Sequence, residues 1–269
     1  MVRKLLRHEF RATQRIILPF YLLLFVTAVM FNISMGLMEK SDAAVQWPLQ
    51  VFFGVSTTSF VVSLIGVTVL CGVLMVYRFY KNLMTDEGYL MFTLPVTVPQ
   101  IIASKLIVTL VWNIVTLLAD ALAALLAFCR TFTVEEIRFA WHEVQEVLSQ
   151  VSTGNIIGYA VELVVLLLFS TLASYLTYYA AIALGHSFAN HKILLSVAFY
   201  FAFAIAMRVV GSIFTTVAMT AAMAVDWEEF NPFALSHWGL GIAAAIAMVQ
   251  AVVFYILTHL MLRKRLNLQ

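Results

Sequence analysis

Long apolar stretches recur along the chain and predict its secondary structure. A helix needs about 20 mostly apolar residues to cross the hydrocarbon core of a bilayer. Such stretches lie at residues 17–37, 51–77, 99–128, 155–184, 193–224 and 239–262. Backbone polar groups in lipid need partners within the chain, so these stretches are expected to be helices. The pattern predicts an all-α, polytopic membrane protein with about six transmembrane helices, forming a single membrane domain over residues 1–269.

Two of these stretches, at residues 155–184 and 193–224, are longer than a bilayer requires. A helix that exceeds the membrane thickness can tilt, protrude or break. Gly211 and Ser212 are the expected position of a break in residues 193–224.

The composition agrees with a lipid environment. Of the 269 residues, 63% are hydrophobic and 11% are charged, whereas a soluble domain has about half apolar and a quarter charged residues. The net charge of +2 gives no basic balance that favours nucleic acid. Cys71 and Cys129 both fall in apolar runs and are expected to be packing residues rather than a disulfide pair. These features exclude a water-soluble globule.

Most of the basic residues fall on one side of the membrane when the predicted spans are placed across it, and this predicts the orientation of the chain. Cytoplasmic loops of membrane proteins carry an excess of Lys and Arg. One side would hold Arg3, Lys4, Arg7, Arg11, Arg15, Arg78, Lys81, Lys105, Lys192, Arg263, Lys264 and Arg265. The other side would hold Lys40, Arg130 and Arg138, among acidic residues that outnumber them. Both termini are therefore expected in the cytoplasm.

The chain begins with a basic amphipathic pattern. Arg3, Arg7, Arg11 and Arg15 recur every four residues and would form one stripe on a helix. This N-terminal helix is expected either to rest on the cytoplasmic lipid surface or to act only as an orientation signal.

Residues 131–150 predict a second amphipathic helix, on the external side. Thr133 and Glu136 have the spacing of a capping box. Apolar residues recur on one face, and among them Trp141 suits a membrane interface. The helix is interpreted as an inert interfacial element or, alternatively, as a lid over an exit path.

Motifs for catalysis or metal binding are incomplete. His8-Glu9 and His142-Glu143 begin like the zinc motif H-E-x-x-H, but the positions of the second histidine hold Ala12 and Glu146. His186 and His191 lie on a short cytoplasmic loop, which is interpreted as a hydrated loop rather than a metal pair. No catalytic, metal-binding or cofactor-binding residue is predicted.

Three charged residues fall inside the predicted spans, where ionisable groups are costly and tend to be paired or functional. From the rise of a helix, Asp120, Arg208 and Glu162 would lie about 22, 24 and 20 Å from the cytoplasmic edge. Because these depths are similar, Arg208 is hypothesised to pair with Asp120, with Glu162 or with both. Such a pair would either clasp helices together or line a translocation route.

The stretch at residues 78–105 is predicted to be cytoplasmic, yet it is rich in aromatic and apolar side chains. Gly88 is interpreted as a helix end and Pro95 as a turn before the next helix. A short amphipathic element of this kind suits docking against a partner. The chain has no P-loop of the form G-x-x-x-x-G-K-[ST], so any ATPase that drives it must be another chain.

The run KNLMTDEGYLMFTLPV at residues 81–96, followed by Ser104 and Lys105, resembles ABC-2-type transporter permeases of Gram-positive bacteria. The basic N-terminus, six spans with both ends inside, and Asn231-Pro232-Phe233 before the last span are also similar to that family. The resemblance implies the membrane subunit of an ATP-driven exporter in the bacterial cell membrane.

The same resemblance implies partners and residue roles. The segment between the second and third spans would be a coupling helix that contacts an ATP-binding cassette subunit, where ATP and magnesium would bind. The residues that would form or shape this contact are Arg78, Tyr80, Lys81, Asp86, Glu87, Gly88, Tyr89, Phe92 and Pro95. A second permease subunit, identical or related, would complete the transporter. The resemblance also implies that the outer part between the fifth and sixth spans folds back into the membrane, at residues 214–225.

Two other functions remain open at this stage. The chain could be a scaffold or sensor subunit that transports nothing. It could also be a membrane enzyme that uses Asp120 and Glu162 as paired carboxylates, although the missing nucleophile and metal motifs argue against that.

Overall fold

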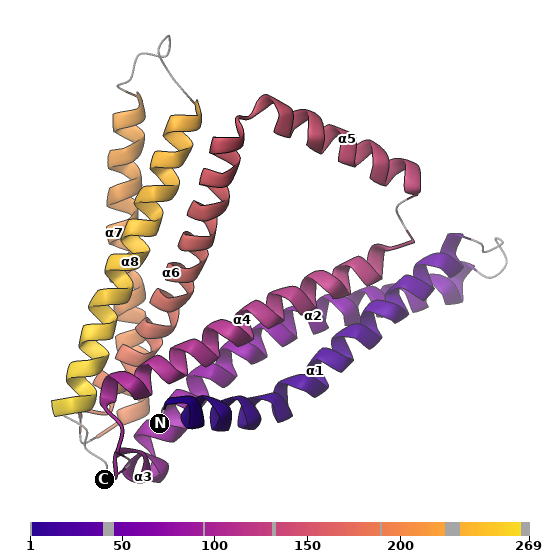
Figure 1. Cartoon of the computed structure of the whole chain (residues 1–269). Coiled ribbons are helices and arrows are strands. Elements are labelled where there is room, and N and C mark those ends of the chain that lie inside the picture. The colour runs from indigo at the N-terminus through magenta and orange to yellow at the C-terminus, as the bar shows by residue number, and fades with distance from the viewer. Residues whose placement is uncertain are drawn as a thin grey trace. The chain divides into compact units, whose positions relative to one another are not determined.

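A computed structural model describes residues 2–39, 46–93, 95–130, 133–188, 190–223 and 232–264 (Figure 1). The described residues form helices and no strands. In chain order the helices are α1 (Val2–Glu39), α2 (Gln46–Met84), α3 (Asp86–Thr93), α4 (Val98–Phe128), α5 (Val134–Gln150), α6 (Thr153–Gly185), α7 (Lys192–Met223) and α8 (Pro232–Lys264).

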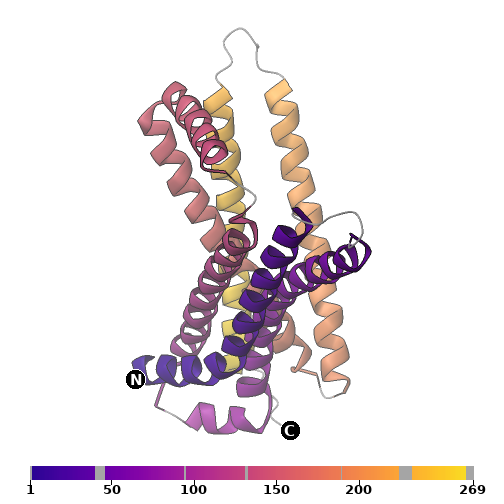
Figure 2. The same ribbon diagram turned by 90° about the vertical axis from the view of Figure 1, so that its right-hand side faces the viewer.

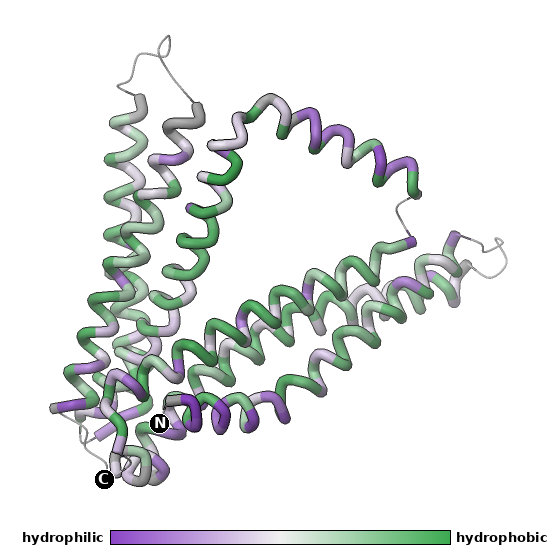
Figure 3. Tube along the Cα trace, in the orientation of Figure 1, coloured by the Kyte–Doolittle hydropathy of each residue, from purple (hydrophilic) through white to green (hydrophobic). Residues whose placement is uncertain are grey.

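The predicted fold class is confirmed: the chain is a polytopic, all-α membrane protein. Six of the described helices, α1, α2, α4, α6, α7 and α8, are long and apolar enough to cross a membrane. Figure 3 shows hydrophobic residues along most of their length, and hydrophilic residues on α5 and on the first turns of α1. Several helices extend beyond the predicted spans, for example α2 and α8.

The chain divides into two compact units, one of Met1–Met75 and Ile107–Val147, the other of Val76–Leu106 and Leu148–Gln269. The single membrane domain expected over residues 1–269 stays a prediction. In the first unit, α1 lies beside α2 and α4 in both views (Figures 1 and 2). Hydroxyl pairs join these helices, with Oγ1 of Thr27 2.6 Å from Oγ of Ser63 and Oη of Tyr21 2.7 Å from Oγ1 of Thr116. Such bonds between side chains hold helices together in lipid.

In the second unit, α6 packs against both α7 and α8. Nε2 of Gln250 donates to Oγ1 of Thr177 at 3.2 Å, which joins α8 to α6. The end of α6 lies so close to the start of α7 that a Cβ atom on Gly185 would be 2.5 Å from the backbone nitrogen of Ser196. This close approach positions the short segment between α6 and α7.

The basic N-terminal segment is the start of a single long helix. Arg3, Arg7, Arg11 and Arg15 are all exposed on α1, as the predicted stripe requires. Pro19 lies inside α1, where it has no N–H to donate to the preceding turn. Figure 1 shows the first turns of α1 at an angle to the rest of that helix, as expected near an internal proline.

The amphipathic helix expected at residues 131–150 is α5, and its predicted capping box is confirmed. The backbone nitrogen of Thr133 donates to Oε2 of Glu136 at 2.8 Å, and the nitrogen of Glu136 donates to Oγ1 of Thr133 at 3.2 Å. These bonds favour the ionised carboxylate, so they lower the pKa of Glu136. Local spacing was sufficient to predict this helix start.

The break predicted at Gly211 and Ser212 is wrong, because α7 continues without interruption to Met223. The hydroxyl of Ser212 donates to the carbonyl of Val209 at 2.8 Å, and that of Thr215 donates to the carbonyl of Gly211 at 2.8 Å. The polar side chains of this stretch thus bond to their own helix instead of opening it.

The same helix overturns the fold-back expected at residues 214–225 over its described part, since residues 214–223 continue α7 in one direction. Residues 224 and 225, and the polar residues Asp226, Glu228, Glu229 and Asn231 that follow them, lie outside the described residues.

Both cysteines are free. Cys71 is buried, as expected of a packing residue, whereas Cys129 is exposed, so the packing role expected for Cys129 is wrong. Cys129 follows the end of α4, on the side that the charge pattern predicts to be external. We expect a membrane-impermeant maleimide to label Cys129 on intact cells, and Cys129→Ser to abolish the labelling because Cys71 is shielded. Labelling that requires permeabilised cells would reverse the predicted orientation.

Candidate functional site

The segment that connects the second and third candidate spans contains a separate short helix, α3. Helix α2 ends at Met84, and Oγ1 of Thr85 donates to the carbonyl of Lys81 at 2.5 Å. The chain then starts α3 at Asp86. A hydroxyl that bonds back to the last turn competes with the backbone and favours a helix end. The structure therefore contains a distinct helix within the predicted connector.

The role assigned to Gly88 as a helix end is wrong. Gly88 is buried within the first turn of α3, and its nitrogen donates to the carbonyl of Thr85 at 2.7 Å. None of the described glycines has the positive φ that a glycine helix cap adopts. The Thr85 side chain, rather than a left-handed glycine, marks the boundary.

The turn predicted at Pro95 is confirmed, since Pro95 lies between α3 and α4. The next helix begins with a cap in which the nitrogen of Thr97 donates to Oε1 of Gln100 at 3.2 Å. The connector is thus bounded by a local helix stop on one side and a helix start on the other.

Helix α3 presents polar and aromatic groups on its surface. Glu87 is exposed, and its Oε1 lies 3.2 Å from Nζ of Lys81. The Tyr89 side chain is 68% exposed. Asp86 and Phe92 also belong to α3, but their side chains lie outside the described part of the structure. The accessible groups of α3 could therefore contact another protein.

The end of α2 that carries α3 is fixed to α6. The rings of Phe79 and Tyr179 stack with their centroids 3.9 Å apart and their planes 6° apart. Both residues are 0% exposed, as is Leu83 one turn later. Arg78 is half-buried beside them. A force applied to the last turns of α2 would therefore act directly on α6.

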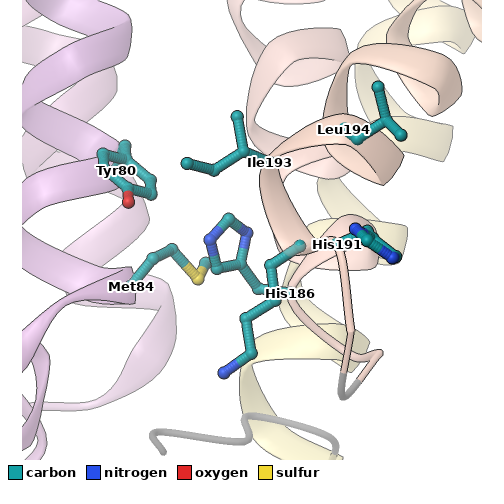
Figure 4. Close-up of a pocket in the computed structure, with 7 residues that line it drawn as sticks. Tyr80, Met84, His186, His191, Ile193 and Leu194 are labelled. Carbon is teal, nitrogen blue, oxygen red and sulfur yellow. The ribbon is translucent and has the colours of Figure 1, made fainter.

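A pocket of about 480 Å³ lies between the end of α2 and the start of α7 (Figure 4). Its lining includes Tyr80 and Met84 from α2, His186 and His191 from the segment after α6, and Lys192, the first residue of α7. Tyr80 is thus a wall of this pocket, in addition to any role in the predicted contact.

The hydrated histidine loop expected from the sequence is correct for His191, which is exposed, and wrong for His186, which is buried. Nδ1 of His186 lies 2.9 Å from the carbonyl of Ile182, one turn back, and 3.3 Å from Oγ of Ser196. Burial, together with the nearby charge of Lys192, lowers the pKa of His186.

The burial of His186 had a weak sequence signal. Histidine near a helix C-terminus often bonds to the last free carbonyls, and His186 directly follows the final residue of α6. The close approach of Ser196, which encloses the ring, had no local signal.

Of the three charges inside the spans, Asp120 belongs to the first unit, and Glu162 and Arg208 belong to the second. Oγ1 of Thr68 donates to Oδ2 of Asp120 at 2.9 Å. Glu162 pairs with His237, whose Nδ1 lies 2.9 Å from both carboxylate oxygens. The Glu162–Arg208 pair hypothesised from the sequence is therefore wrong; Arg208 is exposed on α7. The Asp120–Arg208 pair stays a prediction, because the two residues belong to different units.

His237 was missed because it precedes the apolar stretch at residues 239–262. It lies in the first turns of α8, and its ring stacks on Tyr159 of α6 with centroids 4.0 Å apart. The hydroxyl of Tyr159 also bonds to Oγ of Ser236. These contacts join α6 to α8 and give Glu162 a structural partner.

The comparisons with known proteins identify no family. No family model, curated protein or solved structure matches this chain. Among the residues that the structure describes, no group of three or more His, Cys, Asp or Glu side chains could hold a metal ion.

Proposed function

We propose that this chain is the membrane-spanning subunit of an ATP-driven ABC-2-type transporter, and that a separate ATP-binding subunit docks on α3. The observation that carries the proposal is α3 itself, a helix of eight residues between two candidate spans. Its exposed Glu87 and Tyr89 combine charge with an aromatic ring. Aromatic residues are enriched at the contacts that contribute most to protein–protein binding.

The packing around α3 supports a route by which movement of α3 would reach α2 and α6. The Phe79–Tyr179 stack and the burial of Leu83 join the last turns of α2 to α6. When nucleotide binding moves the partner, a displaced α3 would shift the ends of α2 and α6 together. That shift would switch a cavity in the membrane from inward-facing to outward-facing.

In the proposed assembly, the ATP-binding subunit hydrolyses ATP. ATP and magnesium bind to the ATP-binding cassette subunit, while this chain forms the path in the bacterial cell membrane with a second permease subunit. Both termini are cytoplasmic and the cargo moves outward. The resemblance of residues 81–96 to ABC-2-type permeases supports these points.

Reversing the charge of Glu87 tests the docking surface. We expect Glu87→Lys to reduce copurification of the ATP-binding subunit, and its stimulation by this chain, by about tenfold, equivalent to about 1.4 kcal/mol. An exposed ion pair contributes only about 0–1 kcal/mol to stability, so the thermal unfolding of the variant in detergent should change little.

Glu143→Lys provides the matched control, because Glu143 is exposed on α5, on the side predicted to be external. This variant should bind the ATP-binding subunit normally. If Glu87→Lys also binds normally, α3 is not the docking surface. If the ATP-binding subunit binds the wild-type chain without stimulation or transport, the chain is instead a scaffold or sensor subunit.

A further inference from the structure

Helix α5 has an apolar face that the proposed transport function does not use. At 3.6 residues per turn, an arc of about 60° around the helix holds four apolar residues, Ile137, Trp141, Val144 and Leu148. Their side chains are 57%, 61%, 47% and 42% exposed, so the described part of the chain leaves this apolar arc largely uncovered. Because apolar surface is unfavourable in water, the arc suits an apolar partner.

The opposite face of α5 is polar and acidic. Glu135, Glu143 and Glu146 lie on it, and all three are exposed. Figure 3 shows hydrophilic residues along this helix. A helix that is apolar on one side and charged on the other fits the boundary between an apolar medium and water. Its charged face argues against full insertion into hydrocarbon, where ionised side chains are costly.

The connections of α5 keep it close to two candidate spans. Only Val151 and Ser152 separate α5 from α6, and a connection of that length reaches at most about 11 Å between the two helix ends. At its other end, residues 129–133 separate α5 from α4. Both α4 and α6 are apolar enough to cross a membrane, and the headgroup region on each side of a bilayer is about 5–8 Å thick. The ends of α5 are therefore held near the membrane surface.

Two side chains at the edge of the apolar arc suit the headgroup layer. The indole of Trp141 is apolar with one polar N–H, and rings of this kind are enriched at membrane–water interfaces. Arg138 lies about 60° from Trp141 around the helix. Its apolar stem can lie along lipid while its guanidinium group stays among the headgroups. These two residues favour a shallow position, with the helix axis along the surface.

We propose that α5 lies in the headgroup layer on the predicted external side, with its apolar arc against the acyl chains and its glutamates in water. The partner is the lipid bilayer. The helix holds four glutamates and one arginine, so apolar area rather than charge provides the attraction, and anionic phospholipid is not required. This contact goes beyond the proposed transport function and does not depend on an ATP-binding partner.

Lipid quenching of the full-length chain in proteoliposomes tests the proposal. In a Cys129→Ser chain, Val144→Cys and His142→Cys place a bimane label at two exposed positions about 160° apart around α5, while Cys71 is buried and shielded from the label. Dibrominated phosphatidylcholine quenches fluorophores that contact its acyl chains. We expect quenching in Val144→Cys to exceed that in His142→Cys about threefold, since only the apolar arc would reach the acyl chains.

A second matched pair, Ile137→Cys and Glu135→Cys, should show the same difference two turns earlier, so that a variant that does not fold leaves the other pair to decide. Adding phosphatidylglycerol to the vesicles should leave the ratio unchanged, and a higher ratio would contradict the role given to apolar area. Equal and strong quenching within each pair would place α5 inside the hydrocarbon. Equal and weak quenching would place it in water, or under protein such as a lid contact or a second copy. Either result would overturn the proposal.

Discussion

Replacing Gly185 with alanine is expected to disrupt the junction of α6 and α7. A Cβ atom at this position would overlap Oγ of Ser196, and would lie 2.5 Å from the nitrogen and 2.6 Å from Cα of that residue. Two of these atoms belong to the backbone, so a side-chain rotation cannot relieve the overlap. Overpacking of a tight site typically costs about 1–3 kcal/mol, occasionally more, and we expect Gly185→Ala to reach or exceed the upper value. Thermal unfolding in detergent would measure the loss.

Gly211→Ala is the matched control, because a Cβ atom on Gly211 meets nothing within 4 Å. Alanine favours a helix over glycine by about 1 kcal/mol, so this variant should be neutral or slightly more stable. Adding Ser196→Ala to Gly185→Ala should restore only part of the stability, since the two backbone contacts remain. Normal stability of Gly185→Ala alone would contradict the close approach of α6 and α7.

Replacing Phe79 with alanine is expected to loosen the end of α2 from α6. The ring is fully buried against Tyr179, and truncation of a buried phenylalanine typically costs about 3–5 kcal/mol. Phe79→Leu keeps most of the volume but loses the stacking, which is worth about 0.5–1.5 kcal/mol. Unfolding of the purified chain in detergent should rank the wild type, Phe79→Leu and Phe79→Ala in decreasing order of stability.

Tyr77→Ala provides the control on the same helix, since Tyr77 is exposed and its truncation should cost less than about 1 kcal/mol. Under the proposed function, Phe79→Leu should bind the ATP-binding subunit normally but transmit its movement less effectively, which lowers transport per ATP hydrolysed. Equal stability of Phe79→Ala and Tyr77→Ala would show that the stack does not hold the two helices.

The sequence predicted the features that depend on neighbours along the chain. The six candidate spans followed from apolar runs long enough to cross a bilayer. The reciprocal bonds of Thr133 and Glu136 followed from a spacing of three residues. The turn at Pro95 followed from the restricted backbone of proline. In each case the determining atoms lie within one or two helical turns.

Sequence reasoning failed where a residue could be read in two ways locally. Gly211 and Ser212 can weaken a helix, but here the hydroxyl of Ser212 bonds to its own helix and α7 continues. Gly88 can end a helix, but its backbone is helical and the Thr85 side chain marks the boundary. The choice between these outcomes depends on hydrogen bonds that composition does not specify.

By itself, the sequence determined that this protein is a polytopic, all-α membrane protein and where along the chain most of its helices lie. Only the tertiary structure decided which side chains meet: Phe79 with Tyr179, Glu162 with His237, and His186 with Ser196. A transmembrane helix is apolar around its whole circumference, so hydrophobic periodicity does not indicate which face turns towards a neighbour. That rotation is set by close packing and by hydrogen bonds between helices, which join residues far apart in the chain.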